Sequence, residues 1–156
     1  MTLETLRVIP DVNVLLRAIT GRGLPQRLYT HFRRGELRFV ISADLITELG
    51  RTLTYPRVLG MGRGITPSET FSLAVELLTL AEYHPHVPRL EWPSLHDPKD
   101  WFLLDLLWNT KADALLTLDG RLLESGTVLD MRVMTVEQFH SGGSFPPLED
   151  HPGAGG

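Results

Sequence analysis

The sequence contains no cysteine, which excludes disulfides, a thiolate zinc site and a cysteine nucleophile in this 156-residue chain. It also lacks an apolar run of the roughly 18 residues that a membrane-spanning helix needs. The first five residues do not show the basic-then-apolar order of a signal peptide. We therefore expect a cytoplasmic protein with no membrane partner.

Positive charge is scarce in the second part of the chain. Up to residue 65 there are ten arginines against five acidic residues, whereas the remainder carries five lysines or arginines against fourteen acidic residues. The resulting net charge of −4 does not exclude a nucleic-acid partner if several carboxylates bind cations. Arg17, Arg22 and Arg51 are candidates for contacts with a phosphate backbone, although solvated helix surfaces explain most arginines equally well.

What the sequence does contain is an alternation of short apolar segments with helical ones. Strands are expected at 6–10, 37–41, 114–118 and 131–134, with one weak edge strand within 83–95. Helices are expected to start at 11, 25, 43, 66, 98 and 135, and residues 121–124 to form a short helical turn. This order predicts a three-layer α/β/α sandwich with a central, mostly parallel sheet of four to five strands over residues 1–140. The glycine- and proline-rich tail at 141–156 is expected to be disordered.

Helical spacing predicts which side chains face the core. The rows expected to face inward are Leu103, Leu104 and Leu107 in the helix that starts at 98, and Phe71, Val75 and Leu78 in the helix that starts at 66. Trp108 is expected in the core as well. Asp97 is expected to cap the helix that starts at 98, with Asp100 as the partner in a capping box.

Acidic residues fall where the predicted strands end. Asp11 follows the first strand and Asp119 follows the fourth, while Asp97 and Asp100 open a helix that should begin at the same edge of the sheet. Glu48 lies a turn and a half into the helix after the second strand and can point back toward them. In parallel α/β sheets this edge is where ligands bind.

Two unit charges about 4 Å apart repel by roughly 4 kcal/mol at an effective dielectric constant near 20, so clustered carboxylates need compensation. Helix N-termini supply a part, and a divalent cation can supply the rest; ligands that are all oxygen favour Mg²⁺ or Mn²⁺ over zinc. Each acid alone also has a purely structural explanation. Asp11, Asp97 and Asp119 can be caps or turn residues, Asp100 a capping-box partner, and Glu48 an ion-pair partner of Arg51.

Four segments together resemble the successive motifs of PIN domains. They are 11–15 (Asp-Val-Asn-Val-Leu), 42–49, 97–100 (Asp-Pro-Lys-Asp) and 116–119 (Leu-Thr-Leu-Asp), the last followed by a pair of leucines at 122–123. The resemblance runs from about residue 7 to about residue 139, and the nearest branch is that of bacterial toxin components of toxin–antitoxin modules. Two positions depart from the family pattern. Trp101-Phe102 stands where relatives tend to be polar, and Gly120 interrupts a usual Asp-Lys/Arg-Asp.

The resemblance implies a metal-dependent endoribonuclease that hydrolyses RNA phosphodiester bonds and leaves a 5′-phosphate and a 3′-hydroxyl. It implies an acidic quartet that holds Mg²⁺ or Mn²⁺, an auxiliary acid, and two polar side chains that hold carboxylates or water. Carried over by position, these are Asp11, Glu48, Asp100 and Asp119 for the quartet, Asp97 for the auxiliary acid, and Asn13 and Thr117 for the polar pair. It further implies an RNA substrate, a small antitoxin protein that inserts into the acidic site, and a homodimer.

Three alternatives remain on the sequence alone. The chain can be a PIN-like module that binds RNA or protein without turnover. It can be a phosphatase that uses Asp11 as nucleophile, but Asn13 then stands where acid–base work needs an aspartate. A zinc site at His84, His86 and His96 is disfavoured because prolines interrupt the histidines, which are expected to face solvent at a sheet edge.

Overall fold

The fold is built on a five-stranded sheet whose neighbouring strands are all parallel, in the order β3-β2-β1-β4-β5. The computed structural model describes residues 5–21, 23–53, 66–95 and 98–141. The strands are β1 (Leu6–Pro10), β2 (Leu37–Ser42), β3 (Glu82–His84), β4 (Ala114–Leu116) and β5 (Val133–Met134). The predictions made for Arg22, His96, Asp97 and residues 142–156 lie outside the described residues.

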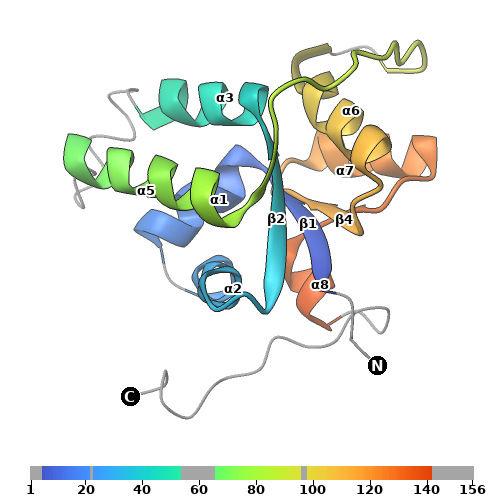
Figure 1. Cartoon of the computed structure of the whole chain (residues 1–156). Coiled ribbons are helices and arrows are strands. Elements are labelled where there is room, and N and C mark those ends of the chain that lie inside the picture. Colours follow the sequence, from blue (N-terminus) through green and yellow to red (C-terminus); the bar gives the residue numbers. More distant parts are fainter. Residues whose placement is uncertain (1–4, 22, 54–65, 96–97, 142–156) are drawn as a thin grey trace.

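Helices cover both faces of this sheet, with α1, α2 and α5 on one side and α6 and α7 on the other (Figure 1). Their bounds are α1 (Val12–Thr20), α2 (Leu24–Arg33), α3 (Ala43–Leu53), α5 (Pro67–Leu80), α6 (Trp101–Thr110), α7 (Gly120–Leu129) and α8 (Val136–Ser141). The predicted three-layer α/β architecture is therefore confirmed, including the weak edge strand, which is β3. None of the described helices is long and apolar enough to cross a membrane.

The core forms where the central strands meet the two helical layers. Val8 pairs with Phe39 on one side and with Ala114 on the other, and all three side chains are buried. The predicted row of Leu103, Leu104 and Leu107 on α6 is buried too, which confirms that this helix faces the sheet.

The short edge strand β3 is fixed by an ion pair that reaches across the sheet. The Arg7 guanidinium on β1 contacts the Glu82 carboxylate on β3, with Nη2 2.6 Å from Oε2. This contact lowers the pKa of Glu82 to about 2, so the carboxylate is charged at neutral pH. A strand of three residues has few ladder hydrogen bonds of its own, and the ion pair adds to them.

Helix α5 presents a different face to the core than its spacing predicts. Phe71 is 72% exposed, and Val75 and Leu78 are also exposed, whereas Leu73 and Leu77 are buried. The prediction for this helix is wrong because α5 carries apolar residues on more than one face, so the sequence alone does not decide which face packs. An exposed apolar row remains on its outer side.

Three further expectations need correction. Trp108 is 51% exposed and lies under the Lys111 ammonium, so it is not a core residue. The helical turn expected at 121–124 is a full helix, α7, of ten residues. The helix expected from Pro98 begins with a 3₁₀ turn, η1 (Pro98–Asp100), and becomes α-helical only at Trp101, so Asp100 occupies the N-cap position without a side-chain capping bond.

Two glycines offer a matched test of the packing. A methyl group at Gly126, inside α7, would lie 2.5 Å from Val133 Cβ, whereas one at Gly50, exposed on α3, would meet no atom within 4 Å. We expect G126A to lower the free energy of unfolding by about 1–3 kcal/mol through overpacking. We expect G50A to raise it by about 0.5–1 kcal/mol because alanine favours the helix. Urea denaturation measures both, and a G126A protein as stable as the wild type would contradict the close packing of α7 on β5.

Candidate active site

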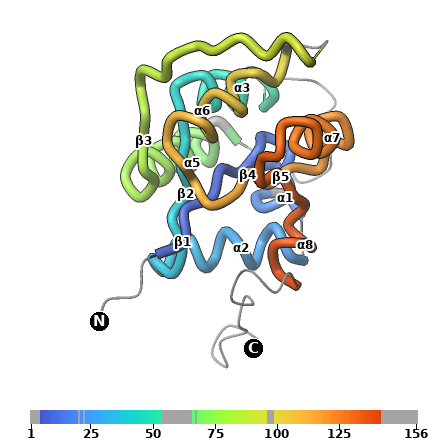
Figure 2. The backbone as a smooth tube through the Cα atoms, turned by 90° about the vertical axis from the view of Figure 1, so that its right-hand side faces the viewer, coloured from blue at the N-terminus to red at the C-terminus, as the bar shows by residue number. Residues whose placement is uncertain are grey.

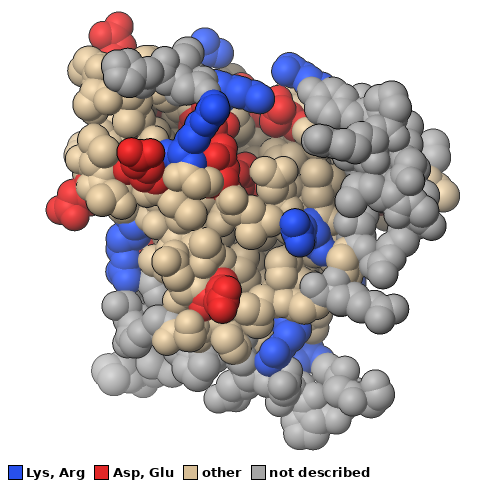
Figure 3. All heavy atoms as spheres, turned by 180° about the vertical axis from the view of Figure 1, so that it is seen from behind, with Lys and Arg blue, Asp and Glu red and all other residues tan. Residues whose placement is uncertain are grey.

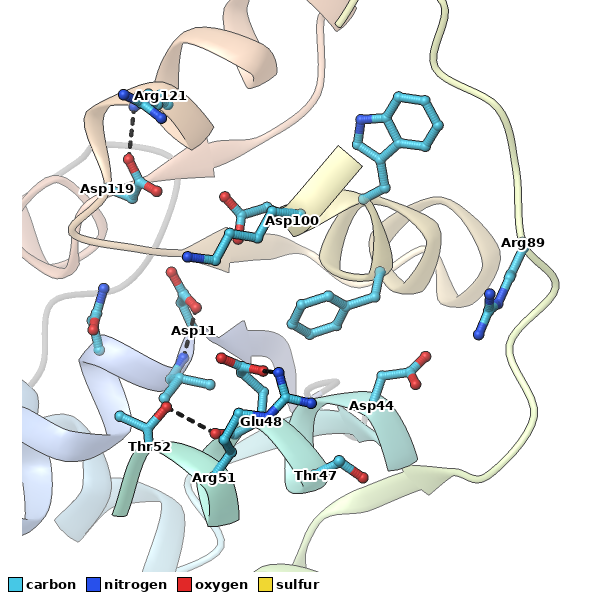
Figure 4. Close-up of a pocket in the computed structure, with 15 residues that line it drawn as sticks. Asp11, Asp44, Thr47, Glu48, Arg51, Thr52, Arg89, Asp100, Asp119 and Arg121 are labelled. Carbon is cyan, nitrogen blue, oxygen red and sulfur yellow. Dashed lines mark hydrogen bonds and ion pairs between the residues drawn. The ribbon is translucent and has the colours of Figure 1, made fainter. Parts of the chain in front are cut away.

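A pocket of about 720 Å³ opens at the edge of the sheet where β1, β2 and β4 end, and all four acids of the predicted quartet line it (Figure 4). Asp11 comes from the end of β1, Glu48 from α3, Asp100 from the turn before α6, and Asp119 from the loop after β4. These residues are far apart in the sequence, and the parallel topology brings their segments to one edge.

Asp11 is held more tightly than a surface carboxylate. Its backbone N–H donates to Leu116 O at 2.9 Å, which continues the contact between β1 and β4 for one more residue. Its Oδ1 accepts the Val12 N–H at 2.7 Å and so caps α1, while its Oδ2 accepts the Thr117 hydroxyl at 2.7 Å. The residue is only 8% exposed. Both carboxylate oxygens are thus oriented by neighbours from two strand ends.

The electrostatic environment of Asp11 disfavours its negative charge. Burial raises the pKa of Asp11, and the hydrogen bonds from Thr117 and Val12 oppose that rise. The nearby carboxylates of Asp119 and Glu48 raise the pKa further. The pocket therefore stabilises positive charge next to Asp11, as expected for a cation site and for a site that receives basic groups.

Thr117 connects Asp11 to Asp119. Its fully buried hydroxyl donates to Asp11 Oδ2 and accepts the Asp119 backbone N–H at 3.0 Å. Asp119 in turn caps α7 by accepting the Arg121 N–H at 2.9 Å. The contact predicted between Thr117 and a neighbouring carboxylate is therefore present. Asn13 also lines the pocket, from the exposed side of the first turn of α1.

Glu48 has the arginine partner that the structural alternative requires. Its Oε2 lies 3.4 Å from Arg51 Nη1, one turn further along α3, and both side chains line the pocket. Since the two atoms are more than 3 Å apart and the Arg51 side chain is largely exposed, this contact is a weak surface pair. It leaves Glu48 at the wall of the pocket (Figure 4).

Asp100 takes the N-cap position of α6 with φ −105° and ψ 9° and makes no side-chain capping bond to that helix. The capping box expected for Asp100 involves Asp97, which lies outside the described residues. The half-buried carboxylate of Asp100 lines the acidic pocket. The 3₁₀ turn before α6 thus brings Asp100 to the wall of the pocket.

The donor set suits a hard divalent cation, because the described residues that line the pocket offer carboxylate oxygens and include no histidine or cysteine. Among the described residues, however, no three acidic or histidine side chains stand together closely enough to hold an ion as a group. His84 does not face solvent as predicted but is half-buried, with Nε2 2.6 Å from Glu82 Oε2.

Basic residues that the sequence did not single out also line the pocket, and Figure 3 shows acidic and basic side chains side by side at one end of the molecule. They are Arg89, Lys99 and Arg121; Asp44, an additional acid, lies on α3. Lys99 and Arg121 lie within two residues of quartet members in the sequence, and this proximity could have predicted that they line the pocket. Arg89 lies in a proline-rich stretch without periodicity and gave no such signal. Of the arginines proposed earlier, Arg51 lines the pocket and Arg17 does not.

A family model described as the PIN domain matches residues 7–121, from β1 to the start of α7. The chain belongs to the PIN-domain family. PIN domains are generally nucleases, and they typically use divalent metal ions. The four predicted acids of this PIN domain all fall within the matched range. No curated protein sequence matches the chain.

The raised pKa of Asp11 makes a prediction about stability. The folded protein binds a proton at Asp11 more readily than the unfolded chain, so the stability that Asp11 permits is full below its unfolded pKa and declines as the pH rises through its folded pKa. We therefore expect D11N to unfold at a higher urea concentration than the wild type at neutral pH in EDTA. The difference should shrink as the pH falls toward about 4.

The matched control is D130N, at an exposed acid that ends α7 with φ 54°, a conformation that asparagine tolerates. Its stability should follow that of the wild type across the same pH range. A D11N protein less stable than the wild type at neutral pH in EDTA would show that the charge of Asp11 is compensated within the folded chain.

Proposed function

We propose that this PIN domain is a metal-dependent endoribonuclease, which hydrolyses RNA phosphodiester bonds to a 5′-phosphate and a 3′-hydroxyl. The observation that supports this proposal is the convergence of Asp11, Glu48, Asp100 and Asp119 on one pocket, from four separate segments of a nuclease-type fold. Capping alone would scatter such acids over both edges of the sheet.

Asp11, Asp100 and Asp119 would hold Mg²⁺ or Mn²⁺, and Glu48 would complete the site or orient water. When bound, such an ion would supply a more acidic water molecule for the hydrolysis and positive charge beside the phosphate oxygens. The chain itself supplies orientation. The Thr117 hydroxyl bonds to Oδ2 of Asp11 and to the backbone N–H of Asp119, so both residues are held in position before substrate binds.

The pocket wall also suits a substrate that brings its own negative charge. Arg51, Arg89, Lys99 and Arg121 line it beside the acids. Phosphates of an RNA chain would meet these groups while the scissile phosphate meets the carboxylates and their cation. Asn13, exposed at the pocket, would hold water or a neighbouring carboxylate, and Asp97 would act as the auxiliary acid.

We further propose that the protein acts in the cytoplasm as the toxin of a toxin–antitoxin pair, whose small antitoxin inserts a basic group into the acidic pocket. The expected homodimer has one supporting observation. Phe71, Val75 and Leu78 form an exposed apolar row on α5 that a second chain can cover. Light scattering after size exclusion would give the mass of a dimer if this row is covered, and that of a monomer if it is not.

A second candidate function is binding of RNA or protein without turnover. It is favoured by the finding that the described residues hold no group of three side chains close enough for a metal ion. Under this alternative the basic residues of the pocket retain RNA, and added Mn²⁺ changes nothing.

Cleavage of labelled RNA in the presence of Mg²⁺ or Mn²⁺ tests the proposal. We expect EDTA to abolish cleavage, and D11N or D100N to reduce it by about a hundredfold or more while the protein remains folded. D130N, an equal change of charge outside the pocket, should cleave like the wild type.

Full activity of D11N or D100N would show that other carboxylates do the work. Wild-type protein that binds the RNA but leaves it intact with saturating Mn²⁺ would support the binding module. Turnover of a phosphomonoester in place of RNA would indicate the phosphatase.

A further inference from the structure

Residues 85–95 connect β3 to the turn before α6 as an extended segment without helix or strand, which we call the strap. Figures 1 and 2 show it running past β2 to the end of the molecule where α3 and α6 begin. A segment of this kind has no ladder hydrogen bonds of its own, so its position depends on contacts with its neighbours.

Two side chains of α6 anchor the strap. The buried Asp105 carboxylate accepts two hydrogen bonds at the same oxygen, Oδ1: the Leu90 N–H at 3.2 Å and the Trp92 Nε1–H at 2.9 Å. Asn109 Nδ2 donates to Pro88 O at 3.2 Å. The strap is therefore tied to α6 on both sides of residue 89.

Arg89, the residue between these anchors, lines the acidic pocket. In Figure 4 its side chain points from the strap into the pocket, toward the side where Asp44 and Glu48 lie. Its side chain makes no hydrogen bond or ion pair with any residue that the structure describes, whereas Arg51 in the same pocket is paired with Glu48. An exposed guanidinium that is held over a pocket of carboxylates and pairs with none of them is available to a ligand.

Asp105 has no place in the cleavage chemistry. It does not line the pocket, and its only described side-chain partners are two N–H groups of the strap. A carboxylate that is 6% exposed and meets only neutral donors costs more to bury than an apolar side chain would. Its effect on the structure is to fix the strap.

We propose that Arg89 binds a phosphate of the RNA next to the one that is cleaved, and that Asp105 is the positioning residue that holds Arg89 there through the strap. The substrate class rests on the proposed function. A guanidinium can donate two parallel hydrogen bonds to phosphate oxygens, which a lysine cannot do. Because the anchors fix the strap before RNA arrives, less conformational freedom is lost on binding.

The affinity for RNA tests this proposal without any need for catalysis. A fluorescein-labelled single-stranded RNA is titrated with protein in EDTA, and its anisotropy is followed over a series of salt concentrations. We expect R89Q to weaken binding about fivefold at low salt and to reduce the slope of log K against log salt by about 0.7, the change for one lost phosphate contact. R38Q, at an exposed arginine on β2 outside the pocket, should change neither quantity.

Substitutions at the anchors separate positioning from general stability. D105N keeps an oxygen that can accept both hydrogen bonds, so we expect it to bind RNA like the wild type. D105A should weaken binding as much as R89Q does, and it should add nothing further in the R89Q background because Asp105 acts through Arg89. N109A, an exposed change that frees the strap at Pro88, should weaken binding in the same direction and covers the case in which D105A does not fold.

The outcomes distinguish this proposal from the proposed ribonuclease activity. If R89Q binds RNA with the affinity and salt dependence of the wild type, the role of Arg89 is overturned even if the wild type cleaves RNA. If R89Q lowers affinity and salt dependence as expected while the wild type shows no cleavage, the role of Arg89 stands and the nuclease activity falls. A wild type that does not bind RNA in EDTA overturns the role of Arg89, whereas cleavage in the presence of Mn²⁺ decides the ribonuclease proposal separately.

Discussion

The central constraint on the site is the electrostatic repulsion between carboxylates that the parallel sheet places at one edge. Asp11 follows β1 and Asp119 follows β4, and these two strands are neighbours, so the two acids meet at one edge of the sheet. Burial and the adjacent charges disfavour the ionised form of Asp11, and only the Thr117 hydroxyl and one backbone N–H oppose this effect. The field of such a pocket attracts cations, and PIN domains typically use divalent metal ions.

The same residues serve the fold and the site. Asp11 caps α1, Asp119 caps α7, and Thr117 holds both ends, so the site is assembled from the contacts that end two strands and begin two helices. Asp100 differs from these two acids, because it lines the pocket without a side-chain capping bond to its helix. On the opposite wall, the strap brings Arg89 to the acids through anchors on α6. One end of the molecule thus combines a group of carboxylates with the exposed guanidinium of Arg89.

The architecture and the acidic edge could be predicted from the sequence because both depend on local signals. Strand periodicity, helix caps and the rule that parallel strands end at one edge predicted that Asp11, Glu48, Asp100 and Asp119 lie together, and all four line one pocket. The face of α5 could not be predicted, since apolar residues surround that helix and only its neighbours decide which of them are buried. Arg89 and Asp105 were missed for a related reason. Arg89 lies on a strap without periodicity, and Asp105 bonds to that strap from α6. Such a contact between distant segments forms only in the tertiary structure.

The most direct test of the cation site is a crystal soaked in Mn²⁺ and examined for anomalous density. We predict a peak in the pocket among the carboxylates of Asp11, Asp100 and Asp119, which disappears in D11N. An empty pocket at a saturating Mn²⁺ concentration, or a peak that persists unchanged in D11N, would contradict the claim that these carboxylates together hold a divalent ion.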